Sequence, residues 1–295
     1  MKLSNAIARV ALAACFSVIL PACATPPAES EAQSTQTVPT LKKVLIVIFE
    51  NTDYAQALAQ PNFGRYATQG ANLTNFLAET HPSQGNYIAL TSGSLNNVRS
   101  DSNIDLDVRN IVDLLEEKGK SWKVYAENYP GNCFLGSSRG DYVRKHVPIL
   151  SYKNVQSNPA RCSKIVDAGQ LNVDVQNQQI PDFSLYIPNL KNDGHDTGVA
   201  FADSWFQQAF SPLLSNASFA GNVTLALTFD ESSMFGGNHI YTVLLGKGVR
   251  SGATSSKRYD HYSLLKTVEL GLGLGNLGMN DAGAAAIDDV WVLQN

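Results

Sequence analysis

The sequence is constrained most by a continuous apolar run at residues 44–49, Val-Leu-Ile-Val-Ile-Phe. Polar pairs flank it, Lys42-Lys43 before the run and Glu50-Asn51 after it. A half-exposed strand alternates apolar and polar residues, whereas a strand buried in a parallel sheet is apolar throughout. The run therefore predicts a buried parallel strand. Similar short runs lie at Trp122–Ala126, Phe183–Ile187, Val223–Phe229 and 240–245.

Helical patterns lie between these runs. Apolar residues recur at helical spacing over 108–115, Val199–Leu214 and 262–270. Strands that alternate with helices are typical of an α/β sandwich around a mostly parallel sheet. Because no repeat or internal linker interrupts residues 41–295, we expect one domain there. The polar segment 129–180 is expected to be an insertion or lid beside the sheet.

The first residues are similar to an export signal. In 1–22, Lys2 and Arg9 precede an apolar stretch that ends in small residues. Residues 20–23, Leu-Pro-Ala-Cys, are similar to a bacterial lipobox, in which the cysteine is acylated and becomes the amino terminus. We expect a solvated tether at 23–40 and a periplasmic or outer-membrane-anchored lipoprotein, with membrane contact through the lipid alone. Cleavage at an ordinary Ala-x-Ala site, giving a soluble secreted product, remains an alternative.

Composition excludes several classes of protein. With 44% hydrophobic and 16% charged residues, the chain does not have the composition of a disordered protein. The net charge is −4, and it becomes −6 if Lys2 and Arg9 are removed with the signal. No run of Lys and Arg is longer than two residues, so we expect no nucleic-acid partner. Cys133 and Cys162 form an even pair in an oxidising compartment, and a bridge between them would stabilise the fold by roughly 3–4 kcal/mol.

Carboxylates follow two of the predicted strands directly. Glu50-Asn51 follows the run at 44–49, and Asp230-Glu231 follows Val223–Phe229. Functional residues gather at the carboxyl ends of parallel strands, so these groups are expected to meet. Taken singly, each pair is equally well explained as a helix cap or a solvated turn. Together, clustered carboxylates repel one another unless a cation intervenes, which favours a divalent metal bound by oxygen ligands.

Ser83 is placed at the start of a predicted helix by the sequence Thr80-His-Pro-Ser-Gln-Gly-Asn-Tyr87. Backbone N–H groups and the helix dipole at such a position stabilise an alkoxide or a bound phosphate. His81 is close enough in sequence to reach the same ligand. The alternative is an ordinary serine N-cap, which is a common use of this residue.

Several histidines lie in polar junctions beside predicted elements. His195 lies in Asn-Asp-Gly-His-Asp after the strand Phe183–Ile187, His239 precedes the run at 240–245, and His261 opens the last helix. These positions favour roles in binding or proton transfer over a purely structural role. His146 lies in a loop with lysine and arginine, and we expect it at the surface.

The motifs resemble the phosphoesterase family that includes bacterial and fungal acid phosphatases and bacterial phospholipases C, a branch of the alkaline phosphatase superfamily. The resemblance covers about residues 43–280 and rests on the order of VLIVIFENTDY, THPSQGNYIALTSG, NDGHDTGVAFADSWF, LTFDESS, GGNHIYTVLLGKGVRSG and YDHYSLLKTVELGLGLGNLG. It implies an enzyme with a three-layer α/β/α sandwich, a catalytic domain at 41–295, and hydrolysis of a small phosphorylated substrate. A phosphate monoesterase that forms a phosphoserine is favoured, with a phospholipase C or another phosphodiesterase as the alternative.

The resemblance also implies roles for individual residues. Ser83 matches the hydroxyl nucleophile, and the metal ligands are matched by Glu50, Asn51, Ser83, Asp230 and Glu231. His195 is the candidate general acid, with Asn192 or Asp193 expected beside it near the phosphate. The phosphate-binding candidates are His81, Asn192, His239 and His261. Two-metal relatives are richer in Asp and His ligands than this chain. One divalent metal is therefore expected, with Ca, Mg or Mn favoured over Zn because the ligands are oxygens.

Other functions are less well supported by the sequence. Gly136-Ser-Ser-Arg-Gly140 matches the Gly-x-Ser-x-Gly elbow of serine esterases, but no buried strand precedes it and no helix follows it. Nothing around Ser83 resembles the sulfatase signature. A surface lipoprotein that binds phosphorylated ligands without turnover stays open.

Overall fold

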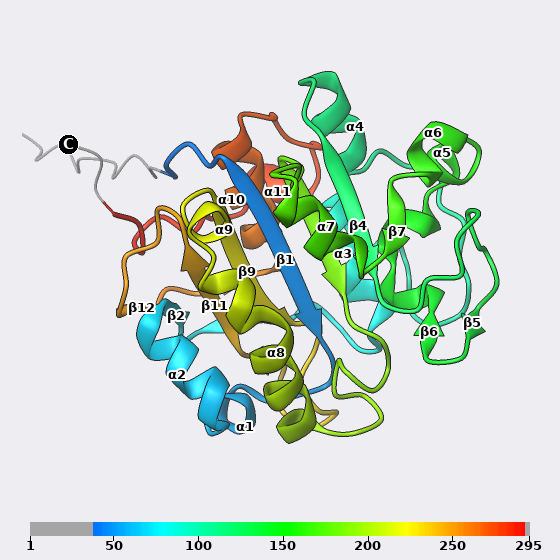
Figure 1. The fold of residues 1–295 in the computed structure, drawn as a ribbon. Helices are drawn as coiled ribbons and strands as arrows, with labels where there is room; N and C mark the ends of the chain where they lie inside the picture. Colours follow the sequence, from blue (N-terminus) through cyan, green and yellow to red (C-terminus); the bar gives the residue numbers. More distant parts are fainter. Residues whose placement is uncertain (1–37, 293–295) are drawn as a thin grey trace, which may run out of the picture. The chain divides into compact units, whose positions relative to one another are not determined.

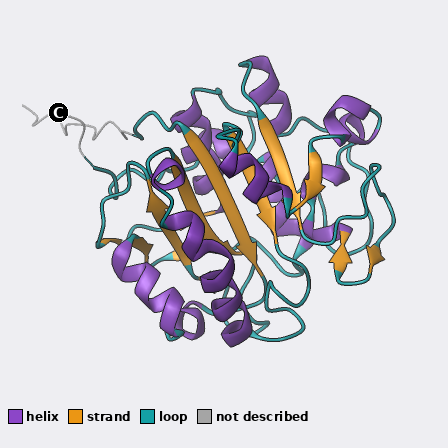
Figure 2. Ribbon diagram, in the orientation of Figure 1, coloured by secondary structure: helices purple, strands orange, loops and turns teal. Residues whose placement is uncertain are grey.

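The computed structural model describes residues 38–292. The predicted signal at 1–22 and nearly all of the predicted tether at 23–40 lie outside this range. Within it, no helix is both long and apolar enough to cross a membrane. Figure 2 shows strands enclosed by helices on both sides, which confirms the predicted α/β sandwich.

The central sheet has eight strands, and only the strand Thr242–Gly246 runs against the others. The predicted strands Trp122–Ala126, Phe183–Ile187 and Val223–Phe229 are confirmed with their bounds unchanged. The order across the sheet is β12 (Ala253–Ser255), β2 (Ala71–Leu73), β11 (Thr242–Gly246), β9 (Val223–Phe229), β1 (Lys43–Phe49), β8 (Phe183–Ile187), β4 (Trp122–Ala126) and β7 (Ile165–Asp167).

The predicted bounds of the strand at 240–245 are wrong, because residues of this apolar run pair in two different sheets. Ile240 pairs with Phe76 in a three-stranded sheet, and Thr242 begins the pairing of β11 with β9. Tyr241 lies between the two pairings, and its hydroxyl donates to the carbonyl of Phe63 at 2.7 Å. The small sheet has the order β10 (His239–Ile240), β3 (Phe76–Leu77) and β13 (Tyr259–Asp260).

Two groups of helices cover the faces of the sheet (Figures 1 and 2). Helices α2 and α8 pack together on one face, and α3 and α10 pack together on the other. The prediction of α8 is confirmed, whereas the helix predicted at 108–115 begins later because Asn110 caps it. The α-helices outside the segment 129–180 are α1 (Tyr54–Leu58), α2 (Pro61–Gln69), α3 (Gln84–Ser92), α4 (Ile111–Glu117), α8 (Val199–Leu214), α9 (Ala217–Ala220), α10 (His261–Leu272) and α11 (Asn280–Gly283).

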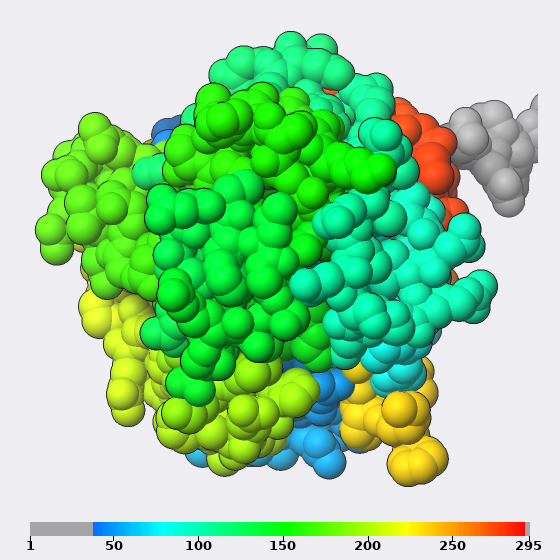
Figure 3. Space-filling view, turned by 90° about the vertical axis from the view of Figure 1, so that its right-hand side faces the viewer, coloured from blue at the N-terminus to red at the C-terminus, as the bar shows by residue number. Residues whose placement is uncertain are grey.

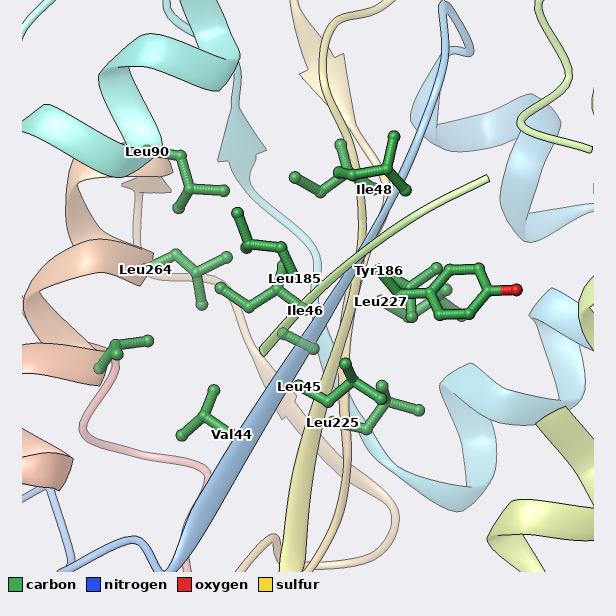
Figure 4. Close-up of a cluster of buried hydrophobic side chains, with 14 of the residues drawn as sticks. Val44, Leu45, Ile46, Ile48, Leu90, Leu185, Tyr186, Leu225, Leu227 and Leu264 are labelled. Carbon is green, nitrogen blue, oxygen red and sulfur yellow. The ribbon is translucent and has the colours of Figure 1, made fainter. Parts of the chain in front are cut away.

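The core lies on both sides of β1. In Figure 4, Leu90 of α3 and Leu264 of α10 lie on one side of this strand, and Tyr186 and Leu227 lie on the other. Tyr186 packs edge-on against Phe210 of α8, with ring centroids 5.0 Å apart. Apolar contact on both faces explains why β1 needs an uninterrupted apolar run.

The segment 129–180 forms one side of the molecule, where its green atoms spread across Figure 3. It also supplies the edge strand β7 of the central sheet. Cys133 and Cys162 form a disulfide, with their Cα atoms 5.3 Å apart. The segment contains β5 (Ser138–Arg139), β6 (Tyr142–Val143), η1 (Arg144–His146), η2 (Pro148–Ser151), α5 (Lys153–Gln156), α6 (Pro159–Cys162), β7 and α7 (Gln170–Gln176).

Candidate active site

Ser83 precedes α3 directly, as predicted, but its side chain does not cap the helix. Its Oγ instead lies 3.0 Å from Glu50 Oε2 and 3.2 Å from Glu231 Oε1, and the residue is buried. The backbone N–H of Gln84, the first residue of α3, donates to Asp101 at 3.0 Å. The interpretation of Ser83 as an ordinary N-cap is therefore wrong, and its hydroxyl is directed at two carboxylates.

Glu50 follows β1 and is 1% exposed. Its Oε1 accepts a hydrogen bond from Tyr87 at 2.7 Å and lies 3.1 Å from His146 Nε2. Its Oε2 accepts hydrogen bonds from Ser83 and from the amide of Asn51, at 3.0 and 2.9 Å. Both oxygens are thus occupied. Burial raises the pKa of Glu50 well above its usual range, and the nearby Asp230 adds to that rise.

Asp230 and Glu231 follow β9, beside Glu50. Burial raises the pKa of Asp230 to about 7, and burial with the Asp230 charge raises the pKa of Glu231 to about 8. Asp230 Oδ1 accepts from the backbone of Asn51 at 3.1 Å, while its Oδ2 is buried without a hydrogen-bond partner. Glu231 Oε2 lies 2.9 Å from His81 Nδ1. The predicted meeting of the two acidic pairs is confirmed.

This cluster has donors suited to a divalent cation. The unpartnered Asp230 Oδ2 is an oxygen that lacks the contact a buried carboxylate requires. The neighbouring donors are the Ser83 hydroxyl and the carboxylates of Glu50 and Glu231, which are hard oxygen ligands. Among residues 38–292, no group of three or more His, Cys, Asp or Glu side chains is already arranged as a metal centre. The donor set fits a cation that prefers oxygen ligands, because the carboxylates and the Ser83 hydroxyl all offer oxygen atoms.

His195 lies close to this cluster, in the loop after β8. Its backbone N–H donates to Asp193 Oδ1 at 2.8 Å, and its ring Nδ1 lies 2.7 Å from Asp196 Oδ1. Its ring centroid is 6.3 Å from that of His146. Asn192, in the same loop, is directed elsewhere and donates to Glu127 at 2.6 Å. The loop therefore brings Asp193 and His195 to the site and directs Asn192 toward a neighbouring cavity.

Of two further predicted residues, His261 lies beside the carboxylates and His239 lies in the small sheet. His261 is buried at the start of α10, and its Nε2 contacts the backbone carbonyl of Asp230 at 2.8 Å. Burial lowers the pKa of His261. His239 Nε2 contacts the carbonyl of Thr74 at 2.9 Å, and its ring stacks on Tyr54. These contacts hold His239 in the small sheet.

The expectation that His146 lies at the surface is wrong. It is 1% exposed and lies between Glu50 and Asp193, with its Nδ1 3.3 Å from Asp193 Oδ2. Its neighbour Lys145 forms an ion pair with Asp101 at 2.8 Å. The sequence does not identify the burial of His146, because nothing near it in the chain shows which acids it meets.

Tyr87 was also missed, although the sequence contains a signal for it. Residues four apart lie on the same face of a helix, so a tyrosine four positions after Ser83 is expected near it. The structure places the Tyr87 hydroxyl 2.7 Å from Glu50. No comparable spacing identifies Lys145 or His146, which reach the site from a distant segment.

The Gly-x-Ser-x-Gly motif has none of the structure that a serine esterase requires. Ser138 lies in the two-residue strand β5, which pairs only with β6, and both residues of β5 are exposed. A nucleophile elbow needs a buried strand before the serine and a helix after it. The structure therefore overturns the esterase alternative at this position.

The sequence is similar to those of known phosphoesterases. A sequence model described as the Phosphoesterase family matches residues 61–275. A protein of Kluyveromyces lactis named "Probable acid phosphatase" is 38% identical over 262 residues, which cover 84% of this chain and 62% of that protein. A Mycobacterium tuberculosis protein named "Phosphatidylinositol-3-phosphatase" is 32% identical over 261 residues, covering 86% of this chain and 84% of that protein. The chain thus spans less than two thirds of the length of the yeast relative.

The fold is similar to that of solved structures. A protein in the alkaline phosphatase superfamily from Vibrio parahaemolyticus superposes with a TM-score of 0.58 over 88% of this chain and 74% of that chain. At 13% identity this similarity concerns the fold alone. It agrees with the α/β sandwich.

Proposed function

Because this chain belongs to the phosphoesterase family, we propose that it is a metal-dependent phosphatase that hydrolyses phosphate monoesters through a phosphoserine at Ser83. The observation that carries the proposal is the position of the Ser83 hydroxyl. It lies at the start of α3, makes no cap, and contacts the carboxylates of Glu50 and Glu231. A serine held in this way is oriented and has a proton acceptor beside it.

In the first step, Ser83 Oγ attacks phosphorus, so that the Oγ–P bond forms and the bond to the leaving oxygen breaks. The Ser83 proton passes to one of the two carboxylates that its oxygen already contacts, that of Glu50 or that of Glu231. The protonated ring of His195 gives its proton to the leaving oxygen, and the alcohol departs. Asp196 orients this ring through Nδ1, which leaves Nε2 for the proton transfer.

In the second step, water attacks phosphorus on the opposite face, and the P–Oγ bond breaks. His195 takes the proton from water, which restores its charged form. The carboxylate returns its proton to Ser83, and inorganic phosphate leaves. The starting protonation state is thereby recovered, so one set of groups serves both steps.

The residues that would hold a divalent cation are Glu50, Asn51, Ser83, Asp230 and Glu231. When bound there, such a cation would supply positive charge that lowers the pKa of the serine hydroxyl and offsets charge on the phosphate. The proposal is supported by the unpartnered oxygen of Asp230 and by the oxygen-only donor set. Mg, Ca and Mn prefer such donors, whereas Zn prefers nitrogen and sulfur.

A matched pair of serine variants tests the proposal. We expect Ser83→Ala to lower kcat for p-nitrophenyl phosphate by at least about 1,000-fold, since a missing nucleophile removes the covalent route. Ser138→Ala, at the exposed Gly-x-Ser-x-Gly motif, should keep the kcat of the wild type. EDTA should abolish hydrolysis, and added Mg, Ca or Mn should restore it. Full activity in Ser83→Ala would refute the proposal.

The class of ester is tested by assaying p-nitrophenyl phosphate, bis-p-nitrophenyl phosphate and phosphatidylcholine side by side. The names of the Kluyveromyces and Mycobacterium relatives support a monoester substrate. We expect turnover of the monoester to exceed that of the diester and the phospholipid. Faster cleavage of either of the latter would assign the chain to the phosphodiesterase or phospholipase C alternative.

A further inference from the structure

His146 contacts both the carboxylate that holds the proposed nucleophile and the loop that carries the proposed acid. It ends η1, in the segment 129–180, and its ring is buried between two acids from other parts of the chain. Nε2 lies 3.1 Å from Glu50 Oε1, and Nδ1 lies 3.3 Å from Asp193 Oδ2. Neither nitrogen has the geometry of a standard hydrogen bond, so these are close electrostatic contacts.

The ring of His146 also stacks on Tyr87. The two ring centroids are 5.2 Å apart and the rings are nearly parallel, at 11°. The hydroxyl of Tyr87 donates to Glu50 Oε1 at 2.7 Å, the same oxygen that His146 contacts. The stacked pair therefore fixes Oε1 from two directions, and Oε2 is left facing Ser83 at 3.0 Å.

The contact with Asp193 extends the connection toward His195. Asp193 Oδ1 accepts from the backbone N–H of His195 at 2.8 Å, and its backbone carbonyl accepts from Glu50 N at 3.1 Å. Asp193 is 1% exposed, so it has no freedom to move into solvent. A shift of His146 would thus change the loop that holds His195 as well as the carboxylate that holds Ser83.

Core packing does not account for these contacts. An apolar ring of similar size would fill the space without the desolvation cost of a buried imidazole between acids. We infer that His146 is a positioning residue that holds Glu50 against Ser83 and Asp193 beneath His195. This inference rests on the proposed phosphatase function. It assigns to the segment 129–180 a part in the reaction that the sequence motifs do not indicate.

Substitutions at position 146 separate the two contacts. A glutamine amide nitrogen reaches about as far as Nε2, whereas the shorter asparagine side chain reaches only the position of Nδ1. We expect His146→Ala to lower kcat for p-nitrophenyl phosphate by about 10- to 100-fold with little change in KM, as outer-shell partners of functional groups do. His146→Gln should have a higher kcat than His146→Asn, because only the glutamine amide reaches Glu50, the residue that holds the Ser83 hydroxyl.

Tyr152→Phe is the matched control for a merely structural effect. Tyr152 is buried in the same segment, and its hydroxyl lies 2.6 Å from Thr91 Oγ1, away from the carboxylates. This variant should lose thermal stability and keep kcat. If the His146 variants also lose only stability, or if Gln and Asn behave alike, the inference is overturned. If His146→Ala does not fold, the Gln and Asn variants decide the question.

Ser83→Ala distinguishes the failure of this inference from failure of the proposed function. Activity that survives Ser83→Ala removes the proposed function itself. Activity that requires Ser83 but is unchanged in every His146 variant removes only the positioning role.

Discussion

Glu269 is a buried acid whose removal should stabilise the protein at neutral pH. It lies in α10, is 0% exposed, and neither carboxylate oxygen has a hydrogen-bond partner of standard geometry. Asp281 lies beside it and accepts backbone hydrogen bonds from Leu277 and Met279 at 2.6 and 2.9 Å. Burial, followed by the charge of Asp281, raises the pKa of Glu269 to about 9.

The consequence for stability follows from the difference between the folded and unfolded states. Below about pH 4.5, Glu269 is protonated in both states and costs nothing. As the pH rises from there toward 9, the unfolded chain loses the proton while the folded chain keeps it, so stability falls. At about 1.4 kcal/mol per pH unit, the loss reaches about 4 kcal/mol by pH 7.5.

Glu269→Gln removes this loss, because a glutamine of nearly the same shape stays neutral at every pH. We expect the variant to be more stable by about 2–4 kcal/mol at pH 7.5 and equal to the wild type near pH 4.5, which is a rise in Tm of roughly 5–15 °C at the higher pH. Thermal unfolding of both proteins across this pH range measures the effect. Glu117→Gln, at an exposed position, is the control for the effect of the substitution itself. A constant difference in Tm at all pH values would refute the reasoning.

Further predictions concern the disulfide and the proposed acid. Replacing Cys133 and Cys162 by serine should lower the free energy of unfolding by about 3.5 kcal/mol, as expected for the 29-residue separation of the two cysteines, and urea unfolding measures this loss. The same variant should have a lower kcat, because the loop that the disulfide closes carries His146. His195→Ala should lower kcat/KM, which covers the steps up to release of the alcohol, by about 100-fold or more for β-glycerophosphate but much less for p-nitrophenyl phosphate, since a good leaving group needs no proton. Equal losses on both substrates would contradict the role of His195 as general acid.

The strands were predictable where burial is complete on both faces. The runs that became β4, β8 and β9 contain enough continuous apolar residues to identify them, because a parallel strand in the middle of a sandwich meets helices on either side. The run at 240–245 failed for a related reason. The apolar character of Ile240 and Val243 indicates that both are buried, but it does not indicate that they belong to different sheets.

The centre of the site was predictable because topology brings it together. Glu50 and Asp230 follow β1 and β9, which are parallel neighbours, so their side chains meet at one end of the sheet. Fine placement was not predictable. Asn192 and Asp193 are adjacent in one loop, yet only Asp193 contacts His146, while Asn192 donates to Glu127. Which of two neighbouring polar residues faces a site depends on the turn, and composition does not encode it.

The contribution of η1 shows what a charge argument would have added. Arg144 is 3% exposed because its guanidinium donates to the carbonyls of Ile104, Leu135 and Leu150, so a basic residue in this segment need not face solvent. A cluster of buried carboxylates requires compensating positive charge. Lys145 meets this need in part, because its positive charge partly opposes the rise in the pKa of Glu50 and of Glu231 that burial causes. In a chain with net charge −4, a basic segment outside the sheet is better interpreted as a counterion to such a site than as surface.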